Sequence, residues 1–416
     1  MPASSKHKIT IPFIPGDGIG QEIMDAARMV IDAAVQQVYG VDKSIRWKEI
    51  SAGEKAFDQT GSWLPDATIQ TIRTHKIAIK GPLTTPVGKG IRSLNVALRQ
   101  SLDLYVCQRP VQWFDGLPSP LNNPLGIDII TFRENTEDLY TGIEYQAGTP
   151  AHQLFMEMIR KNHPEDFKKI TDPDHCGIGI KPISKSNSRR IMAAAIQWAK
   201  ENQRSHITIV HKGNIMKYTE GAFRQWAYET AENDFRDVVF TARQYKTAKE
   251  TESEAQADAI KQEALSRGKL WIDDVIADVV FEQLITKPQS FDTFVTTNLN
   301  GDYLSDAAAA LAGGVGISPG ANINYHSGTA LFEANHGSAV GIAGKGIANP
   351  SSLILSAVMM LDFIGWEEAA QIILAGVKQT IQSKKVTPDL ADRIENATTL
   401  STQQYTQAII QNIFHL

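Results

Sequence analysis

The chain has 416 residues, of which 42% are hydrophobic and 21% charged, and its net charge of −5 gives no support for nucleic-acid binding, which usually shows as a basic domain or stripe. Two cysteines, Cys107 and Cys176, are too few for a disulfide framework, and no CxxC or Cys/His cluster suggests zinc. No segment approaches 18 uninterrupted apolar residues and no signal-peptide core follows the N-terminus, so we expect a soluble, cytoplasmic protein of two or three packed lobes.

Short β-type runs alternate with helical patterns along most of the chain. Strands are expected at residues 8–13, 44–50 and 75–79, and buried strands at 127–132, 207–210 and 291–296. Helical spacing of apolar residues predicts helices over 23–38, 93–104, 351–363, 367–383 and 402–414. Strands that alternate with helices predict an α/β fold with a mostly parallel sheet at its centre.

Two segments depart from this alternation. Residues 141–182 mix turn signals, charges and short apolar runs, and they end in the β-type stretch HCGIGIKPI, which suggests a small inserted subdomain. Residues 246–269 are rich in Glu, Ala, Lys and Gln with few large apolar side chains, which is typical of a solvated helix or a surface excursion. We assign the second segment no catalytic role.

The glycine-rich turn GDGIG, residues 16–20, invites comparison with a dinucleotide-binding loop. Its spacing is not GxGxxG, and no acidic residue stands clearly at the end of the next strand to hold a ribose. A tight strand-to-helix turn explains the glycines as well. We therefore expect no Rossmann fold, and any nucleotide must bind elsewhere in the chain.

The stretch GIRSLNVALRQSLDLYVCQRP carries candidate ligands for a small anion. In a helix, Asn95 and Arg99 lie on one face, and Ser93 stands near the helix start, where free N–H groups can hold an anion. Arg109 lies just past that helix, and Arg133 follows an apolar strand. One such arginine alone is usually a surface ion-pair partner. The set would suit a small polycarboxylate, because guanidinium groups match carboxylates with two parallel hydrogen bonds.

Three aspartates could form a site for a hard cation. Asp302 and Asp306 are four residues apart and share one face if a helix begins there, and Asp278 lies in IDDVIADVV. Carboxylates without His or Cys nearby indicate Mg²⁺ or Mn²⁺ rather than zinc. The alternatives are structural: Asp273 or Asp274 could cap a helix, and Asp302 could be an N-cap or first-turn residue that interacts with the helix dipole.

Tyr140 and Lys212 are the candidate acid and base groups. Lys212 follows the apolar run ITIVH, where partial desolvation could lower the pKa of its ammonium group. Tyr140 follows two acidic residues in TEDLY. Each residue alone is weak evidence, because an amphipathic Tyr or Lys at the edge of a lobe is usually structural.

The later glycine-rich stretch, residues 330–350, is the better candidate for a nucleotide site. Its glycines permit close approach of a ligand to the backbone, and Asn349 precedes a proline at a helix start. The alternative is an ordinary long loop. Loops of this length inside compact domains are usually functional, which favours the nucleotide site.

Nine stretches spread over nearly the whole chain resemble a single family. They are IPGDGIG, GPLTTPVGKGIRSLNVALRQSLDLYVCQRP, FRENTEDLYTGIE, HCGIGIKP, HKGNIMKYTEGAF, DVIADVV, NLNGDYLSDAAAA, PGANIN and FEANHGSAVGIAGKGIANP. In content and order they resemble the isocitrate/isopropylmalate dehydrogenase family of β-hydroxyacid oxidative decarboxylases, most closely the bacterial homodimeric isocitrate dehydrogenases. The resemblance implies a large domain of residues 1–106 and 300–416, a small domain of 107–140 and 183–299, and a clasp of 141–182 that interlocks two subunits.

The resemblance also implies a role for each matching residue. Tyr140 and Lys212 would transfer protons, with Lys212 crossing from the partner chain. The isocitrate carboxylates would be bound by Ser93, Asn95, Arg99, Arg109 and Arg133. A Mg²⁺ or Mn²⁺ ion would be held by Asp302 and Asp306 together with Asp278 of the partner subunit. Thr84 and Thr85 would lie beside the nicotinamide, and the adenosine half would contact His336, Gly337, Ser338, Ala339, Val340, Gly341, Ile342 and Asn349.

The reaction implied by the resemblance is oxidation of isocitrate at C2 followed by loss of CO₂ to give 2-oxoglutarate, with a bound metal polarising the C2 oxygen. A Tyr/Lys pair would reprotonate the carbon. The polar pair Ser93 and Asn95 favours a carboxylate over the isopropyl group of 3-isopropylmalate; homoisocitrate and tartrate dehydrogenases are further alternatives. Outside this chemistry, a non-catalytic regulatory subunit is the alternative, but such a subunit should have lost the metal or acid/base residues, all of which are present. In related bacterial enzymes the serine matching Ser93 is phosphorylated, which makes a kinase a candidate partner.

The resemblance finally implies NAD rather than NADP as the cofactor. NADP-dependent bacterial relatives hold the 2′-phosphate with a Lys–Tyr pair in the adenosine loop and with a Tyr and an Arg further on. The matching residues here are Gly341, Ile342, Pro388 and Asp392. Each lost charge-assisted hydrogen bond is worth roughly 1.5–3 kcal/mol, so NADP should be disfavoured, and Asp392 would help to hold the ribose. The alternative is that Lys345 or Lys384 reaches the phosphate.

Overall fold

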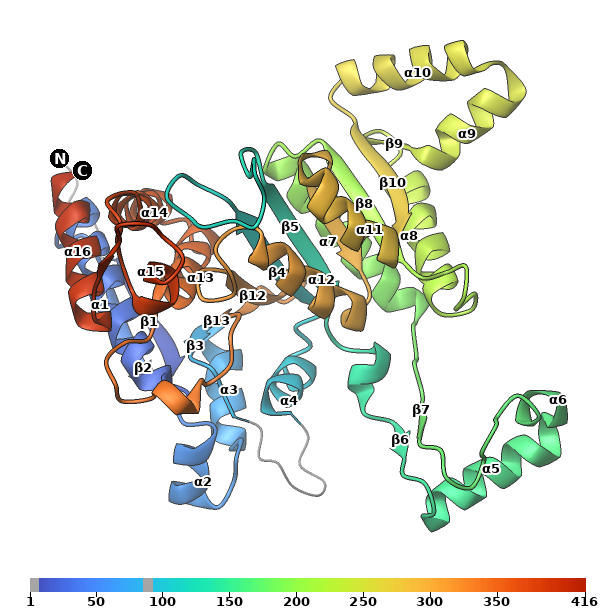
Figure 1. Ribbon diagram of the computed structural model, residues 1–416, viewed down its shortest axis with the longest axis horizontal. Coiled ribbons are helices and arrows are strands. Elements are labelled where there is room, and N and C mark those ends of the chain that lie inside the picture. Colours follow the sequence, from blue (N-terminus) through green and yellow to red (C-terminus); the bar gives the residue numbers. More distant parts are fainter. Residues whose placement is uncertain (1–6, 85–92) are drawn as a thin grey trace.

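The computed structural model describes residues 7–84 and 93–416, and one mixed sheet of eleven strands runs through it (Figure 1). In spatial order the strands are β2 (Lys43–Glu49), β1 (His7–Ile14), β3 (Ile77–Lys80), β13 (Thr329–Ala334), β12 (Pro319–Asn324), β4 (Val106–Gln112), β5 (Asp128–Glu134), β11 (Thr293–Thr296), β8 (His206–His211), β10 (Leu270–Ile276) and β9 (Val239–Thr241). Neighbours are parallel except in the pairs β13–β12, β12–β4 and β4–β5. The expected α/β fold with a mostly parallel sheet is confirmed, and its order is not that of a Rossmann fold.

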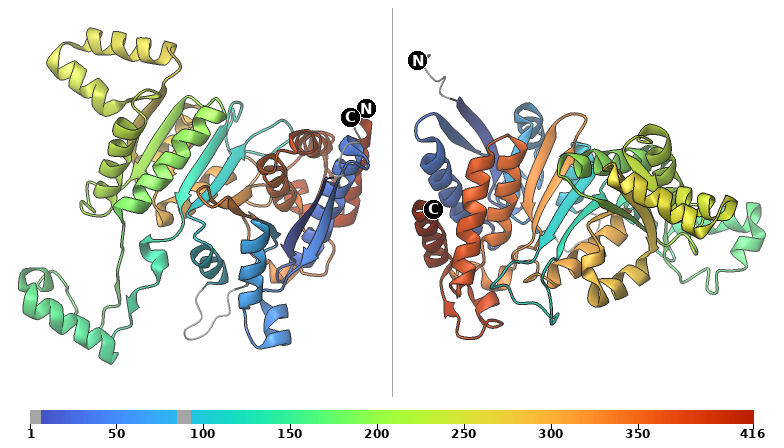
Figure 2. Two further views of the ribbon diagram at one scale, coloured as in Figure 1. Left: turned by 180° about the vertical axis from the view of Figure 1, so that it is seen from behind. Right: turned by 90° about the horizontal axis from the view of Figure 1, so that it is seen from above.

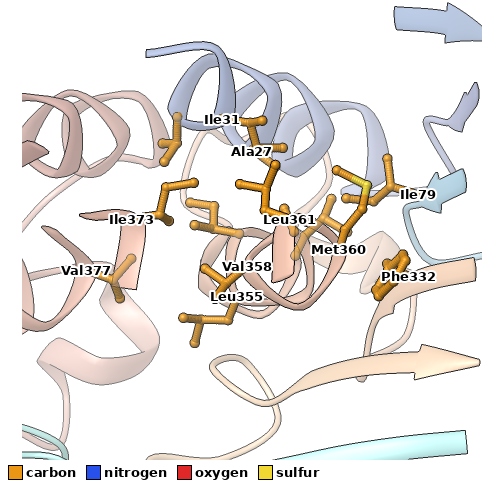
Figure 3. Close-up of a cluster of buried hydrophobic side chains, with 14 of the residues drawn as sticks. Ala27, Ile31, Ile79, Phe332, Leu355, Val358, Met360, Leu361, Ile373 and Val377 are labelled. Atoms are coloured by element: carbon orange, nitrogen blue, oxygen red, sulfur yellow. The ribbon is translucent and has the colours of Figure 1, made fainter. Parts of the chain in front are cut away.

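Helices α1 (Gly20–Tyr39), α13 (Ser351–Phe363), α14 (Glu367–Gln382) and α16 (Thr402–His415) pack on the half of the sheet near both chain ends (Figure 1). Figure 3 shows their shared core, in which Ala27 and Ile31 of α1 lie close to Leu361 of α13. Ten of the thirteen residues of α13 are buried, which marks it as the central helix. Ile79 of β3 and Phe332 of β13 belong to the same core, so these two strands are firmly held.

The other half of the sheet has helices on both faces (Figure 2). Helices α7 (Lys185–Glu201) and α8 (Glu220–Asp234) share one core with β8 and β10. Helices α11 (Ala277–Thr286) and α12 (Asn298–Ala310) share a second core with β5 and β11. Helix α12 is thereby fixed against β5, with which it forms the central part of the candidate site.

Two segments project from this body (Figures 1 and 2). The first follows β5 and contains η1 (Asp138–Thr141), β6 (Glu144–Tyr145), α5 (Pro150–Asn162), α6 (Pro164–Phe167) and β7 (Ile178–Gly179). We call it the arm; it spans the segment that the sequence sets apart, and its role as a clasp stays a prediction. The second is α9 (Ala242–Thr251) with α10 (Glu254–Ser266), over the residues for which the sequence predicts a solvated helix or a surface excursion. Ser253 starts a new helix there, because its hydroxyl accepts from the backbone N–H of Gln256.

Most expected boundaries differ from the structure by one to three residues, and three of these differences are described here. His75 ends α3 (Asp66–His75) instead of starting a strand, because Lys76 takes a left-handed conformation that terminates the helix. Phe291 precedes β11, and the helix expected over 93–104 is the shorter α4 (Leu94–Ser101). The remaining elements are α2 (Glu54–Thr60), η2 (Pro288–Ser290), η3 (Val340–Ile342), β14 (Lys385–Val386), α15 (Pro388–Ala391) and β15 (Thr398–Thr399). Among the described residues, no helix combines the length and apolarity that crossing a membrane requires.

Candidate active site

Two arginines from neighbouring strands converge on carboxylates of α12. Arg109 of β4 and Arg133 of β5 are 7% and 1% exposed, and both guanidinium groups contact Oδ1 of Asp302. Arg109 also lies 3.4 Å from Asp306 and 2.7 Å from the hydroxyl of Ser305. Because Asp302 and Asp306 are one helical turn apart, both face the strands, as their spacing predicts. Helix α12 begins at Asn298, so Asp302 is not an N-cap residue.

Tyr140 completes this group from the start of the arm. Its hydroxyl donates to Oδ2 of Asp302 at 2.5 Å, and the guanidinium of Arg133 lies 4.8 Å from the centre of its ring. Burial and the hydrogen bond to Asp302 raise the pKa of Tyr140 to about 12. At neutral pH the side chain is therefore a phenol that carries a proton, which suits a proton donor.

Helix α4 and its N-cap carry three residues that are expected to bind the substrate, namely Ser93, Asn95 and Arg99. Ser93 is the N-cap residue of α4, yet its side chain makes no capping hydrogen bond. Among the described residues, Oδ1 of Asn95, Nε of Arg99 and one terminal nitrogen of Arg133 are buried without a hydrogen-bond partner. Such orphan groups are rare in folded proteins and need an explanation. A groove of about 870 Å³ is lined by Ser93, Tyr140 and the arm strands β6 and β7, but the three residues with unpaired atoms are not among its lining residues.

Lys80 and Glu333 are charged residues of this site that were absent from the candidates chosen by sequence. They are 1% and 6% exposed; Nζ of Lys80 lies 2.7 Å from Glu333, and Arg99 donates to the same carboxylate at 2.8 Å. The sequence signal was a single charge at the end of each apolar strand, IAIK and TALFEA. The group therefore combines four cations with three carboxylates, namely Lys80, Arg99, Arg109 and Arg133 with Asp302, Asp306 and Glu333.

Lys212 and Asp278 form a pair that is separate from this group. Lys212 follows β8, Asp278 lies in the first turn of α11, and their side chains contact each other. Within residues 7–84 and 93–416, neither side chain has a hydrogen bond or ion pair to the arginines or to Asp302, and no three His, Cys, Asp or Glu side chains gather closely enough to hold a metal. The three aspartates proposed as metal ligands are thus not assembled by one chain.

The alternative that Asp273 or Asp274 caps a helix is wrong. Both residues lie inside β10, and α11 starts only at Ala277. The carboxylate of Asp274 accepts hydrogen bonds from Arg224 and Tyr228 of α8, at 2.6 to 2.8 Å. It holds α8 to β10, the strand next to the edge strand β9.

The turn GDGIG contacts two loops that are expected to bind the cofactor, the loop of Thr84 and the loop of Ser338. Oδ2 of Asp17 accepts from the backbone N–H of Thr84 at 2.7 Å, and the hydroxyl of Thr84 donates to Ser338 at 2.8 Å. A Cβ at Gly18 would lie 2.1 Å from the carbonyl oxygen of Ser338, so only glycine permits this approach. The turn is structural, as expected, and it joins the loop of Thr84 to that of Ser338. Thr85 lies outside the described residues.

The loop from His336 to Asn349 follows β13 and has the features of a ligand cradle. Nε2 of His336 is buried without a partner, and burial lowers the pKa of its ring, which is therefore neutral. Ala339 has a left-handed φ of 40°, a conformation often found at functional sites. A Cβ at Gly337 or Gly341 would meet nothing within 4 Å, so both face open space. Val340 and Ile342 bound the short helix η3, and Asn349 donates to Asp389 at 3.0 Å.

None of the four residues that match the 2′-phosphate ligands of NADP-dependent relatives carries a positive charge. Gly341 and Ile342 lie in η3, while Pro388 begins α15 and Asp392 is its C-cap residue. Lys345 lies four residues after Gly341 and is exposed, and Arg393, next to Asp392, is exposed and donates to the carbonyl oxygen of Gly313 at 2.8 Å. Nζ of Lys384 donates to the carbonyl oxygen of Glu395 at 2.9 Å.

Comparisons with known proteins agree over nearly the whole chain. Residues 10–409 match the family model described as isocitrate/isopropylmalate dehydrogenase. The chain is 51% identical over 403 residues to the protein named isocitrate dehydrogenase (NADP) of Staphylococcus aureus strain Mu50, covering 97% of this chain and 95% of that protein. It is 47% identical to the protein of the same name from Pseudomonas aeruginosa strain UCBPP-PA14, covering 96% and 92%. A crystal structure of isocitrate dehydrogenase from Methylococcus capsulatus is 38% identical, with a TM-score of 0.74 over 98% of this chain and 99% of that one.

These names overturn the expectation of NAD, because relatives this similar over the whole chain are named for NADP. The expectation rested on four side chains compared position by position. A phosphate is held by whichever cations and N–H groups surround it in space, and these can come from other positions of the same loops. Loss of two cations at matched positions was therefore not sufficient to exclude NADP.

Proposed function

Since the chain belongs to the isocitrate/isopropylmalate dehydrogenase family, we propose that it is an NADP-dependent isocitrate dehydrogenase that produces 2-oxoglutarate and CO₂. Relatives at 47–51% identity carry this name. The observation that carries the proposal is the buried cluster in which Arg109 and Arg133 contact Asp302 and Arg99 contacts Glu333, with polar atoms that lack partners among the described residues.

The charge of the cluster favours isocitrate over a dicarboxylate. Its four cations and three carboxylates leave one positive charge, and a divalent metal would raise the excess to three. Isocitrate is a trianion at neutral pH, whereas isopropylmalate and tartrate are dianions. A buried site is most stable when its charges balance, because uncompensated charge in a low dielectric is costly.

Asp302 and Asp306 would hold Mg²⁺ or Mn²⁺ together with Asp278 of the partner subunit. Oxygen-only ligands one helical turn apart fit such an ion, and both carboxylates retain a solvent-facing side, with side-chain exposures of 32% and 53%. Burial would raise the pKa of Asp302, but Arg133 and Arg109 outweigh it and hold this pKa below its ordinary value. The carboxylate is thus ionised and ready to bind a cation. When bound, the metal supplies Lewis acidity at the C2 oxygen of the substrate.

The chain's own residues provide binding and proton transfer. Arg99, Arg109 and Arg133 would pair with substrate carboxylates, and Ser93 and Asn95 would contact the remaining one. Tyr140 holds a phenolic proton next to Asp302 and could deliver it to the carbon that CO₂ has left. Lys212 would act as its proton partner from the other subunit.

NADP would lie between the loop of Thr84 and the loop from His336 to Asn349. The open glycines and the unpaired Nε2 of His336 fit a dinucleotide that approaches the backbone closely. Because the four compared positions carry no cation, the 2′-phosphate would be met by Lys345 and Arg393. The expected consequence is a selectivity for NADP that depends on these two residues.

We further propose a homodimer in which each site receives Lys212 and Asp278 from the partner subunit. Support comes from the arm, whose helix α5 exposes the apolar residues Leu154 and Met158, at 68% and 44%. Exposed apolar surface of this kind marks an interaction site. The domain boundaries, a kinase that phosphorylates Ser93, and a cytoplasmic location stay predictions from the sequence.

A substrate panel tests this function. Purified protein is assayed with isocitrate, 3-isopropylmalate, homoisocitrate and tartrate, with and without Mn²⁺, using NADP and NAD in turn. We expect Mn²⁺-dependent reduction of NADP with isocitrate, loss of this activity in Arg133→Lys, and little change in Arg204→Lys. Arg204 is a matched control because it pairs with Asp128 and Asp292 away from the site. Faster turnover of isopropylmalate than of isocitrate, or no turnover of isocitrate, would contradict the proposal.

A further inference from the structure

Glu333 lies at the centre of a fully buried hydrogen-bonded group next to the substrate site. Its Oε1 accepts from Arg99 at 2.8 Å and from Nδ2 of Asn322 at 2.7 Å, while Oε2 lies 2.7 Å from Nζ of Lys80. Three side chains from three different elements therefore meet on one carboxylate. We propose that Glu333 is a positioning residue that orients Arg99 for the isocitrate carboxylate; the proposal rests on the function proposed above.

The hydrogen bonds of Arg99 show how Glu333 would act. Glu333 occupies one terminal nitrogen of the guanidinium group, and Nε stays buried without a partner. A guanidinium group is planar and rigid, so fixing one corner fixes the direction of its other N–H groups. Those donors remain free for a ligand. Without the anchor, Arg99 could rotate and lose the geometry that two parallel hydrogen bonds to a carboxylate require.

Lys80 serves as the second cation that keeps Glu333 ionised. Burial alone would raise the pKa of the Glu333 carboxyl, but Lys80 and Arg99 outweigh burial and hold the pKa well below its ordinary value. Glu333 therefore stays negative over the whole range in which the enzyme would work. Its charge also separates two buried cations that would otherwise repel each other.

The backbone makes this arrangement rigid. Glu333 of β13 pairs directly with Lys80 of β3 in the parallel register. Asn322 of β12 is held in turn by Asn135, whose Nδ2 donates to it at 2.9 Å and also to the carbonyl oxygen of Leu104. Two linked amides thus brace the same carboxylate oxygen that Arg99 contacts, which limits its movement as preorganised sites require.

Replacement of Glu333 by glutamine should weaken isocitrate binding while leaving the cofactor site intact. Glutamine keeps the shape, but it removes the charge and presents an NH₂ group to Lys80 or Arg99. Because a hydrogen bond to a charged group contributes about tenfold or more to binding, we expect kcat/KM for isocitrate to fall at least about tenfold in Glu333→Gln. The fall should come mainly from KM for isocitrate, with KM for NADP changed by less than about threefold.

A double-mutant cycle separates positioning from a merely structural role. Wild type, Glu333→Gln, Arg99→Met and the double variant are compared by kcat/KM for isocitrate and by calorimetric binding of isocitrate with Mn²⁺. If Glu333 acts through Arg99, adding Glu333→Gln to Arg99→Met costs little more. Losses that multiply, or a Glu333→Gln enzyme with unchanged isocitrate KM, would overturn the proposal.

Two further variants keep the result interpretable. Glu134→Gln is the matched control, because Glu134 is a buried strand carboxylate that, within the described part of the chain, accepts from Thr136 and the backbone of Glu137 and has no ion pair with the arginines, and it should leave isocitrate KM unchanged. If Glu333→Gln alone does not fold, Lys80→Met with Glu333→Gln restores the charge balance and should show the same weak isocitrate binding; normal binding would overturn the proposal. A wild type inactive on isocitrate would reject the proposed function itself, whereas an active wild type with a silent Glu333→Gln rejects only the role of Glu333.

Discussion

Gly301 of α12 lies directly against the stem of Arg133, which makes Gly301→Ala a sharp test of the arginine cluster. A Cβ at this position would lie 2.6 Å from Cγ and 2.7 Å from Cβ of Arg133, and 3.0 Å from Cγ2 of Thr296. These are atoms near the backbone and not the free end of a flexible chain. Arg133 would have to retreat by roughly 1 Å to reach ordinary contact distance, although its guanidinium is held by Asn298 and Asp302.

Two opposing effects decide the stability of Gly301→Ala. Alanine is favoured over glycine inside a helix by about 1 kcal/mol, whereas overpacking a buried site costs about 1–3 kcal/mol. The net loss is therefore about 0–2 kcal/mol, which lowers Tm by only a few degrees. Catalysis is more sensitive, because a displacement of about 1 Å can cost roughly 100-fold in rate.

We therefore expect Gly301→Ala to keep most of its thermal stability and to lose about 100-fold in kcat/KM for isocitrate. Thermal unfolding and steady-state kinetics at saturating NADP and Mn²⁺ measure the two quantities on the same sample. Gly376→Ala in α14 is the control, because a Cβ there would also be crowded, 2.9 Å from Cγ1 of Ile413, but away from the arginines, so isocitrate kinetics should not change. A Gly301→Ala enzyme with unchanged isocitrate kinetics would refute the role assigned to Arg133.

Three further predictions concern the dimer, the substrate groove and pH. Mixed Lys212→Ala and Tyr140→Phe proteins should regain about a quarter of wild-type activity, because random exchange makes half of the dimers hybrid and each hybrid restores one of two sites; no recovery after demonstrated exchange would argue against shared sites. Ser93→Asp should nearly abolish isocitrate turnover without lowering Tm, because the added charge faces the substrate groove, and an active variant would exclude Ser93 from the site. Burial raises the pKa of Glu137 from 4.5 to about 7, so the folded protein binds the proton more tightly and loses stability as pH rises between these values. Glu137→Gln should therefore unfold at higher temperature than wild type at pH 8 and at nearly the same temperature at pH 5; the reverse order would contradict the burial argument.

Local sequence patterns correctly predicted the helices and strands in which buried residues recur at a regular spacing. The helix expected over 351–363 coincides with α13, because apolar residues recur there at helical spacing and Pro350 and Gly365 bound the stretch. Asp302 and Asp306 were correctly placed on one helical face, since that relation depends only on a spacing of four residues. Local order of this kind is contained in the sequence itself.

The predictions that failed, the helix cap at Asp273 or Asp274 and the choice of NAD, depend on contacts that a local sequence pattern does not show. Asp273 and Asp274 suit a helix start, and only the contacts of Asp274 with Arg224 and Tyr228 show why they belong to a strand. The choice of NAD failed because it compared single positions, whereas a phosphate responds to every charge around it. Arg224 and Tyr228 lie about 50 residues before Asp274 in the chain, and the cations proposed for the phosphate lie beside the compared positions, not at them.

The sequence by itself determined the α/β class, the family and the residue types that a metal-dependent decarboxylating dehydrogenase needs. Only the tertiary structure decided how these charges are paired. Lys80 and Glu333 are about 250 residues apart in the chain, and they meet because β3 and β13 are hydrogen-bonded neighbours in the sheet. A carboxylate in a strand does not reveal its partners, because its charge is stabilised by whatever the fold places within a few ångströms, and Coulomb energy depends on that distance and not on separation along the chain.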